Sequence, residues 1–201
     1  MAQQIVLATH NPHKVEEFQA IVAQARPDLT VIGYDGPEPV EDGVTFAANA
    51  LLKARTAAAH TGLPALADDS GICVDVLGGA PGVFSAYWAG HAKDAAANLD
   101  LLLDQLSDIG DPHRGAQFVS TIALVVPGEG DAEHVVEGRW RGRLARAASG
   151  GGGFGYDPIF IPDGQPAGAE RTVGEWSAEE KNGASHRSRA FTELVPLLAT
   201  L

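Results

Sequence analysis

The stretch Leu66–Gly90 constrains the fold more than any other, because a short apolar run in it ends in two adjacent carboxylates, Asp68 and Asp69. Ser70-Gly71 and a loop rich in glycine and proline follow this pair. Like charges a few ångströms apart raise one pKa, so adjacent carboxylates need a positive partner, commonly a divalent metal or a proton. Two explanations stay open here: a functional acidic site, or a solvated turn in which Ser70-Gly71 are the turn residues.

Composition limits the class of protein. The chain has 201 residues, 45% of them hydrophobic, so it can bury a substantial core as one domain or as two tightly joined lobes. A net charge of -12 argues against a nucleic-acid polymer or an acidic membrane as partner, because both require a basic face. The single cysteine, Cys73, excludes an internal disulfide and a cysteine-cluster zinc site. The opening segment MAQQIVLATH has no basic leader and no membrane-length apolar run, so a cytoplasmic location is expected.

The N-terminal segment predicts a strand, a tight turn and a helix. Gln4–Ala8 is a short apolar run, and apolar residues then recur at helical spacing over Val15–Ala25. Asn11 suits the N-cap of this helix and Pro12 its first position. Lys14 then lies in the first turn, where the helix dipole is already positive, so the lysine and the free N–H groups predict an anion site. A solvated surface lysine is the alternative.

An alanine-rich stretch predicts a second helix that carries further polar groups. Thr45 suits its N-cap, and Gly62 marks its end. Asn49 and Lys53 are four residues apart, so they share one face of this helix, one turn from an acidic loop that holds Glu41. The alternative is an ordinary polar stripe on the helix surface.

The rest of the chain shows further strands and helices, with no internal repeat and no separable linker. Strands are expected at 29–33, 65–67, 72–77, 116–126 and 133–144, with a hairpin turn at 127–130. Helices are expected at 94–106, at 177–183 and from 185 to the end. Four glycines at 150–153 precede Phe154, which predicts either a loop that closes over a flat ligand or a flexible connector. The pattern indicates an α/β fold.

Together these segments supply the groups needed to hydrolyse a nucleoside triphosphate with magnesium. The acidic groups are Glu41, Asp68 and Asp69, the phosphate-binding groups are Asn11, Lys14 and Lys53, and an aromatic ring with donors comes from Phe154, Lys181, His186 and Arg187. Five motifs, in order, carry a resemblance: LATHNPHK, EDGVTFAANALLKA, ADDSGICVDVLGGAPGVFSA, GGFGYDPIFIP and EEKNGASHR. Through them, almost the whole chain resembles the Ham1/RdgB family of inosine/xanthosine triphosphate pyrophosphatases.

The resemblance implies a fold and an activity. The fold would be α/β, a long twisted mixed sheet with surrounding helices, in a single domain over 1–201 whose two lobes enclose a central cleft, assembled as a homodimer. The activity would be the Mg²⁺-dependent hydrolysis of dITP, ITP, XTP and dXTP to the monophosphate and pyrophosphate, which cleans the nucleotide pool.

Two positions depart from the family pattern: Ala48, where members often carry glutamate, and Tyr87, where they carry arginine.

The resemblance also implies roles for individual residues. Asp69 would be the catalytic carboxylate, and Glu41 and Asp69 would hold the metal, supported by Asp68. The nucleoside triphosphate would be bound by Thr9, His10, Asn11, Pro12, His13, Lys14, Lys53, Ser70, Phe154, Gly155, Tyr156, Asp157, Lys181, His186 and Arg187. The alternatives are a Maf-like pyrophosphatase for other modified nucleotides and a nucleotide-binding module without turnover.

Overall fold

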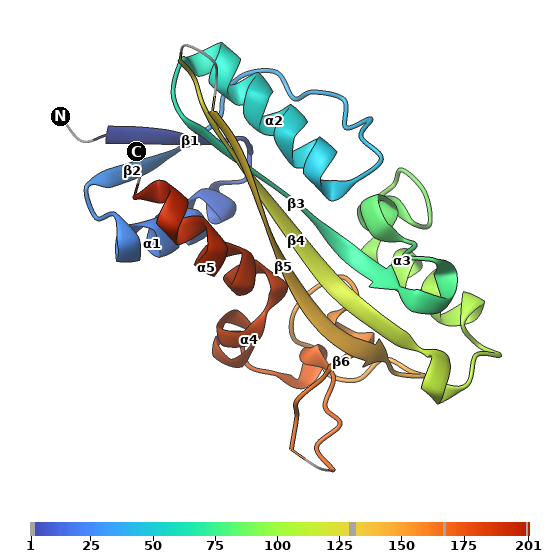
Figure 1. The fold of residues 1–201 in the computed structure, drawn as a ribbon. Coiled ribbons are helices and arrows are strands. Elements are labelled where there is room, and N and C mark those ends of the chain that lie inside the picture. The colour runs from blue at the N-terminus through green and yellow to red at the C-terminus, as the bar shows by residue number, and fades with distance from the viewer. Residues whose placement is uncertain (1–2, 129–131, 167, 200) are drawn as a thin grey trace. The chain divides into compact units, whose positions relative to one another are not determined.

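The computed structural model describes residues 3–128, 132–166, 168–199 and 201, and these form an α/β fold (Figure 1). The strands are β1 Gln3–Leu7, β2 Leu29–Gly33, β3 Ala65–Val74, β4 Gly115–Val126, β5 Ala132–Leu144 and β6 Phe160–Pro162. The helices are α1 Pro12–Ala25, α2 Phe46–Thr61, α3 Ala95–Gln105, α4 Ala178–Ala184 and α5 His186–Leu198. Within the described ranges, no helix has the length and apolar character needed to cross a lipid bilayer.

The sheet is mixed, as the resemblance implied. Its strand order is β2-β1-β3-β4-β5-β6, with β1 parallel to both β2 and β3 and with β6 antiparallel to β5. The strands expected at 116–126 and 133–144 are confirmed to within one residue by β4 and β5. The hairpin turn expected between them falls partly on residues 129–131, which lie outside the described residues.

The predicted helix caps are confirmed. The Asn11 side-chain oxygen accepts a hydrogen bond from the His13 backbone N–H at 3.0 Å, and α1 begins at the next residue after Asn11. Thr45 caps α2 through its hydroxyl oxygen, which lies 3.1 Å from the backbone nitrogen of Ala48. Gly62 ends α2 with a φ of 69°, a left-handed conformation that glycine adopts without strain.

The prediction of two separate strands at 65–67 and 72–77 is wrong. A single strand, β3, runs through both aspartates and Gly71, and a short 3₁₀ turn follows at Asp75–Leu77. Gly71 serves close packing here, because a Cβ atom at this position would lie 2.3 Å from the hydroxyl oxygen of Ser85. That hydroxyl accepts a hydrogen bond from the Ile72 N–H at 2.9 Å. The solvated Asp-Asp turn is therefore excluded.

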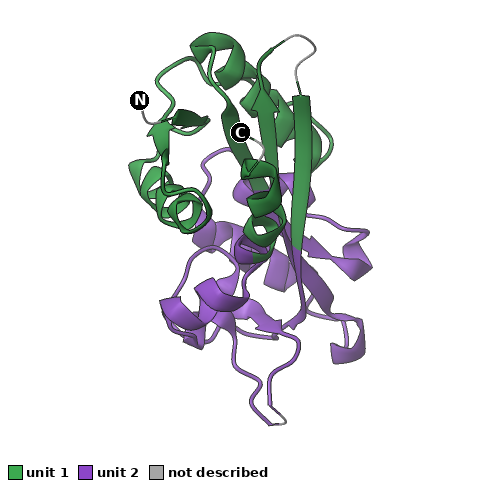
Figure 2. Cartoon of the chain, turned by 60° about the vertical axis from the view of Figure 1, so that its left-hand side comes forward, with its two compact units in different colours: residues 1–69, 120–138, 189–201 green, residues 70–119, 139–188 purple. Residues whose placement is uncertain are grey.

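The chain divides into two compact units (Figure 2). Unit 1 comprises residues 1–69, 120–138 and 189–201, and unit 2 comprises residues 70–119 and 139–188. By sequence, β3, β4 and β5 each contribute residues to both units.

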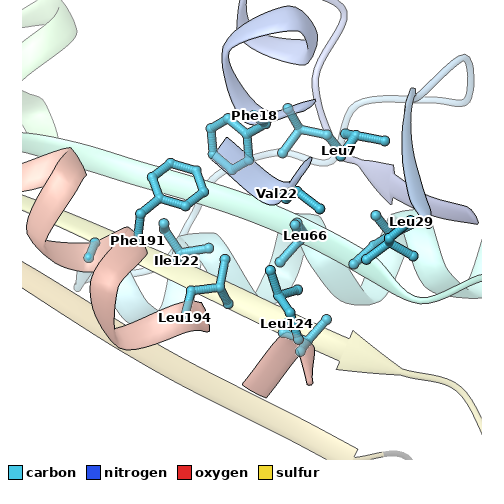
Figure 3. Close-up of a cluster of buried hydrophobic side chains, with 13 residues drawn as sticks. Leu7, Phe18, Val22, Leu29, Leu66, Ile122, Leu124, Phe191 and Leu194 are labelled. Carbon is cyan, nitrogen blue, oxygen red and sulfur yellow. The ribbon is translucent and has the colours of Figure 1, made fainter. Parts of the chain in front are cut away.

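In unit 1, apolar side chains fill both faces of the sheet. Leu66 of β3 belongs to a cluster with Phe18 of α1 and Phe191 of α5 (Figure 3). The two phenylalanine rings pack edge to face, with their centroids 4.6 Å apart. Its strand neighbours, Ala65 and Ala67, belong to another cluster with the alanines of α2. Because successive side chains of a strand point to opposite faces, Asp68 lies on the α1 face of β3 and Asp69 on the α2 face.

Unit 2 has its own core of large aromatic residues and one buried cation. Trp140 of β5 packs edge to face on Phe160, with ring centroids 5.5 Å apart. Arg114 is 2% exposed. Its guanidinium donates hydrogen bonds to the backbone carbonyl groups of Leu106, Leu144 and Ala145. These bonds satisfy the buried charge and tie the end of α3 to the end of β5.

Candidate active site

Lys14 and Asp68 form a buried ion pair in unit 1. The Lys14 ammonium lies 2.9 and 3.0 Å from the two carboxylate oxygens of Asp68. The Asp68 side chain is 5% exposed and the Lys14 side chain 33%. A carboxylate this buried needs a charged partner, and the first turn of α1 supplies it. Lys14 is therefore not a solvated surface lysine.

Asp69 lies on the opposite face of β3 and meets α2. Its Oδ1 is 3.6 Å from the Lys53 ammonium, which also lies 3.3 Å from a carboxylate oxygen of Glu41. Its Oδ2 accepts a hydrogen bond from the Asn49 side-chain amide at 3.2 Å. The polar stripe that the sequence placed on α2 thus faces the acidic residues instead of solvent.

The pKa of Asp69 is raised above its ordinary value. Burial is the largest cause, and the negative charges of Glu41 and Asp68 add to it, while the Lys53 ammonium and the Asn49 hydrogen bond lower the pKa. The charge of the adjacent Asp68 makes the smallest contribution to the pKa of Asp69. The reason is that it lies on the other face of the strand, next to Lys14. A carboxylate with a raised pKa suits proton transfer near neutral pH.

The residues around Asp69 fit the predicted metal. The Lys53 ammonium already lies between the carboxylates of Glu41 and Asp69, so this position attracts a cation. Carboxylate oxygens are the ligands that Mg²⁺ prefers, and it often takes one or two of them together with substrate phosphates. In the part of the chain that the structure describes, no three His, Cys, Asp or Glu side chains gather into a metal-holding group. Asp68 is directed to Lys14 instead.

The turn before α1 is held by its own side chains. The Thr9 hydroxyl accepts a hydrogen bond from the Asn11 N–H at 3.2 Å, and Asn11 in turn caps the helix through the N–H of His13. His10 points to the acidic loop, with its Nδ1 3.0 Å from the carboxylate of Glu38. These contacts leave the predicted phosphate-binding role of the turn untested.

In unit 2, Asp157 organises the glycine-rich loop. Its Oδ2 lies 2.5 Å from the Lys181 ammonium and 2.8 Å from the Phe154 backbone nitrogen. The same ammonium lies 4.3 Å from the centre of the Phe154 ring, which is 68% exposed. Gly153 has a φ of 71°, and a Cβ atom there would lie 2.1 Å from the Asp157 carboxylate. The loop therefore presents an aromatic face to solvent, backed by a cation.

Tyr156 belongs to the core of unit 2. Its hydroxyl donates a hydrogen bond to the backbone carbonyl of Ser85 at 2.9 Å, and burial raises its pKa to about 12. Gly155, between Phe154 and Tyr156, has a φ of 61°. This left-handed residue lets one aromatic side chain face solvent while the next is buried.

The remaining predicted residues of unit 2 lie near the start of α5 and on β3. His186 is 8% exposed, and its ring stacks on Phe118 at a centroid distance of 4.9 Å. Arg187 follows it, and its side chain is partly exposed. Ser70 is also partly exposed, on the unit 2 part of β3. Their assignment to nucleotide binding stays a prediction.

Two further residues, Asn49 and Gly43, contact the predicted site residues, although the sequence pattern did not assign them to the site. Asn49 is 3% exposed and bridges Asp69 to the Gly43 N–H, which donates to its side-chain oxygen at 2.8 Å. A Cβ atom at Gly43 would lie 2.5 Å from that oxygen. The i, i+4 spacing of Asn49 and Lys53 was the available signal, but the link to Gly43 was not visible in it.

Comparison with known proteins agrees with this geometry. A sequence model of the Ham1 family matches residues 5–197. The chain is 60% identical over 197 residues to a Leifsonia xyli protein named dITP/XTP pyrophosphatase, a match covering 98% of this chain and 96% of that protein.

Two solved structures are also similar. One is a HAM1 protein from Coxiella burnetii, with a TM-score of 0.88 and 39% identity, covering 99% of this chain and 100% of that one. The other is a nucleoside-triphosphatase / dITP/XTP pyrophosphatase from Mycobacterium abscessus, with a TM-score of 0.81 and 47% identity, covering 96% and 100%. The similarity therefore extends over nearly the full length of all the compared chains.

Proposed function

This chain belongs to the Ham1 family, and we propose that it is a dITP/XTP pyrophosphatase, a hydrolase that converts non-standard purine nucleoside triphosphates to the monophosphate and pyrophosphate. Its high identity to a relative of that name supports the substrate class. The observation that carries the chemistry is the position of the Lys53 ammonium between the carboxylates of Glu41 and Asp69. Acidic groups would accept the highly charged triphosphate through a bound divalent cation, and the Lys53 ammonium would add further positive charge.

Asp69 is the residue best suited to activate water. Its carboxylate, largely shielded from solvent and with a raised pKa, would orient the water and accept its proton. The water oxygen then forms a bond to the α-phosphorus while the bond to the bridging oxygen breaks, and pyrophosphate leaves. Such reactions depend mainly on positioning and charge neutralisation, which Lys14 and Lys53 would provide for the leaving pyrophosphate.

The metal we propose is Mg²⁺. Glu41 and Asp69 would hold it, since both carboxylates already lie beside a cation. When bound, the ion would neutralise phosphate charge. Removing divalent metal with a chelator should abolish pyrophosphate release, and added Mg²⁺ should restore it. Undiminished activity after exhaustive chelation would contradict the assignment.

The base would be read by residues of unit 2. The exposed Phe154 ring suits stacking on a purine. Donors from His186, Arg187 or the backbone would satisfy the 6-keto oxygen of hypoxanthine or xanthine and would face the 6-amino group of adenine without an acceptor. Sites that hydrogen-bond one substrate group can strongly reject an analogue that leaves them unpaired.

A panel of nucleotides tests this function. Pyrophosphate release is measured with dITP, ITP, XTP, GTP and ATP, and we expect the inosine and xanthosine nucleotides to be preferred. Preference for pyrimidine or other modified nucleotides would favour a Maf-like enzyme, and binding without product would favour a nucleotide-binding module. Arg187→Ala should reduce the preference for dITP over dATP, and an unchanged preference would remove Arg187 from base recognition.

Three expectations concern the protein as a whole. We propose that it folds as a single domain over residues 1–201, forms a homodimer and works in the cytoplasm. The single domain and the homodimer rest on the motifs that the chain shares with the family. Calorimetry should show one cooperative unfolding transition, and light scattering should give twice the mass of the chain. Two separate transitions or a monomeric mass would contradict them.

A further inference from the structure

We call Glu41, Asp68 and Asp69 the acidic cluster. Asn49 of α2 connects the loop that carries Glu41 to the strand that carries Asp69. Its side-chain oxygen accepts a hydrogen bond from the Gly43 N–H at 2.8 Å, and its side-chain nitrogen donates one to Oδ2 of Asp69 at 3.2 Å. It is 3% exposed, so the loss of either bond would leave a polar group buried. One side chain therefore links the acidic loop, residues 34–43, to β3.

The orientation of the Asn49 amide follows from its partners. A backbone N–H can only donate, so the side-chain atom that faces Gly43 must be the oxygen. The nitrogen is thereby directed to Asp69, whose carboxylate accepts. A flipped amide would place the Asn49 NH₂ group against the Gly43 N–H and the Asn49 oxygen against the Asp69 carboxylate. The bridge fixes a single arrangement.

This arrangement distinguishes the two oxygens of Asp69. Oδ2 is occupied by the Asn49 amide, whereas Oδ1 faces the Lys53 ammonium at 3.6 Å. Lys53 comes one turn after Asn49 on α2 and also reaches Glu41 at 3.3 Å. Two side chains of one helix, Asn49 and Lys53, therefore hold the Asp69 carboxylate. The same two side chains also hold the acidic loop, Asn49 through Gly43 and Lys53 through Glu41.

We propose that Asn49 is a positioning residue for the hydrolysis, which orients the Asp69 carboxylate and tethers the acidic loop so that Glu41 and Asp69 are held in place before substrate binds. The inference rests on the proposed function. Gly43 is part of the device, because a Cβ atom there would lie 2.5 Å from the Asn49 oxygen and would displace it. Preorganisation of this kind acts on the chemical step, because Asn49 itself is buried.

Two substitutions separate the halves of the bridge. Asn49→Asp keeps an oxygen for the Gly43 N–H but replaces the donor to Asp69 with a second carboxylate oxygen, whereas Asn49→Ala removes both contacts. For both variants, kcat with dITP should fall about 10- to 100-fold, the range seen for residues that orient active-site ligands, with KM nearly unchanged. A kcat within about threefold of wild type in both variants would overturn the proposal.

Amide hydrogen exchange at Gly43 gives a readout that does not depend on turnover. Loss of one hydrogen bond should speed its exchange about tenfold in Asn49→Ala, while Asn49→Asp should keep the wild-type protection. Gly43→Ala should reproduce the kcat loss of Asn49→Ala, and the double variant should lose little more, because both changes break one link. An equal exchange rate of the Gly43 amide in wild type and Asn49→Ala would show that Asn49 does not tether the acidic loop, and this would overturn the tethering part of the proposal.

Asn98 of α3 provides a matched control in unit 2. It is also 3% exposed, and its side chain accepts from the Ala89 N–H at 2.6 Å and donates to the Ala86 carbonyl at 3.0 Å. This bridge joins backbone groups only. Asn98→Asp should therefore lower the melting temperature without lowering kcat at a temperature where the variant stays folded. A kcat loss equal to that of Asn49→Asp would show that the effect is general and would overturn the proposal.

Failure of the proposed function can be told apart from failure of this inference. If wild type releases no pyrophosphate from dITP, the proposed function fails. The positioning role is then decided on the protein without nucleotide, by Gly43 exchange and by Mn²⁺ binding measured by electron paramagnetic resonance. Mn²⁺ should bind about tenfold more weakly to Asn49→Ala than to wild type. An unchanged Mn²⁺ affinity would overturn the positioning role of Asn49.

Discussion

The acidic cluster of unit 1 and the glycine-rich loop of unit 2 hold the side chains predicted to be functional in opposite ways. In unit 1, Asp68 and Asp69 lie on a strand between two helices, and each carboxylate has a cationic partner. In unit 2, Phe154 lies on a loop with left-handed glycines and is 68% exposed. Charged groups gain most from a buried, preorganised frame, whereas an aromatic ring needs only an accessible face.

This contrast separates two effects of mutation. Changes in the acidic cluster should reduce kcat or alter stability, because its carboxylates are paired with cations and those of Asp68 and Asp69 are largely shielded from solvent. Changes at the tip of the loop should mainly weaken substrate binding, because the exposed ring contributes little to the core.

The largest effect is expected at Asp69. Asp69→Asn removes the group proposed to accept the proton from water, so pyrophosphate release from dITP should fall at least about 10³-fold. The circular dichroism spectrum should stay that of wild type, since asparagine has nearly the same shape. Turnover near the wild-type rate would remove Asp69 from the chemistry.

The next effect concerns stability in unit 1. Lys14→Met leaves the buried Asp68 carboxylate without its ammonium, at 2.9 Å in the wild type, and should lower the free energy of unfolding by about 1.5–3 kcal/mol. Urea denaturation measures this loss. The double variant Lys14→Met/Asp68→Asn should recover part of it, because the buried carboxylate charge is removed together with the ammonium. If the single and double variants are equally unstable, charge pairing is not the cause.

A smaller effect is expected in unit 2. Phe154→Ala removes the exposed ring, so KM for dITP should rise about tenfold through lost stacking, with kcat largely kept. The melting temperature should hardly change, because the ring is outside the core. A large fall in melting temperature, or a fall in kcat with unchanged KM, would contradict the contrast between the two units.

The smallest effect is the pH dependence of stability due to Asp69. A carboxyl group whose pKa is raised on folding binds its proton more tightly in the folded state, so its effect is to lower stability as pH rises above the ordinary value of 3.8. Asp69→Asn should therefore melt a few degrees higher than wild type at pH 7. This advantage should vanish below the ordinary aspartate pKa. A variant less stable than wild type at pH 7 would show that the Lys53 and Asn49 contacts outweigh burial.

Much of the local structure could be predicted from the sequence because it depends on neighbouring residues. Asn11, Thr45 and Gly62 mark the ends of α1 and α2 through backbone conformation and capping, which involve only a few residues. The shared face of Asn49 and Lys53 follows from helical spacing. The five motifs located the two parts of the candidate site, although the roles of their residues stay predictions.

The tertiary structure decided how the carboxylates are used. The sequence predicted separate strands on either side of Asp68 and Asp69, but a single strand runs through both, and Gly71 within it allows Ser85 to pack closely. As a result the two carboxylates lie on opposite faces and meet different cations, one of them 54 residues away in sequence. The sequence by itself determined which groups are present and which helix turn carries each one. Their pairing and their pKa depend on burial and on long-range contacts, which form only when the chain is folded.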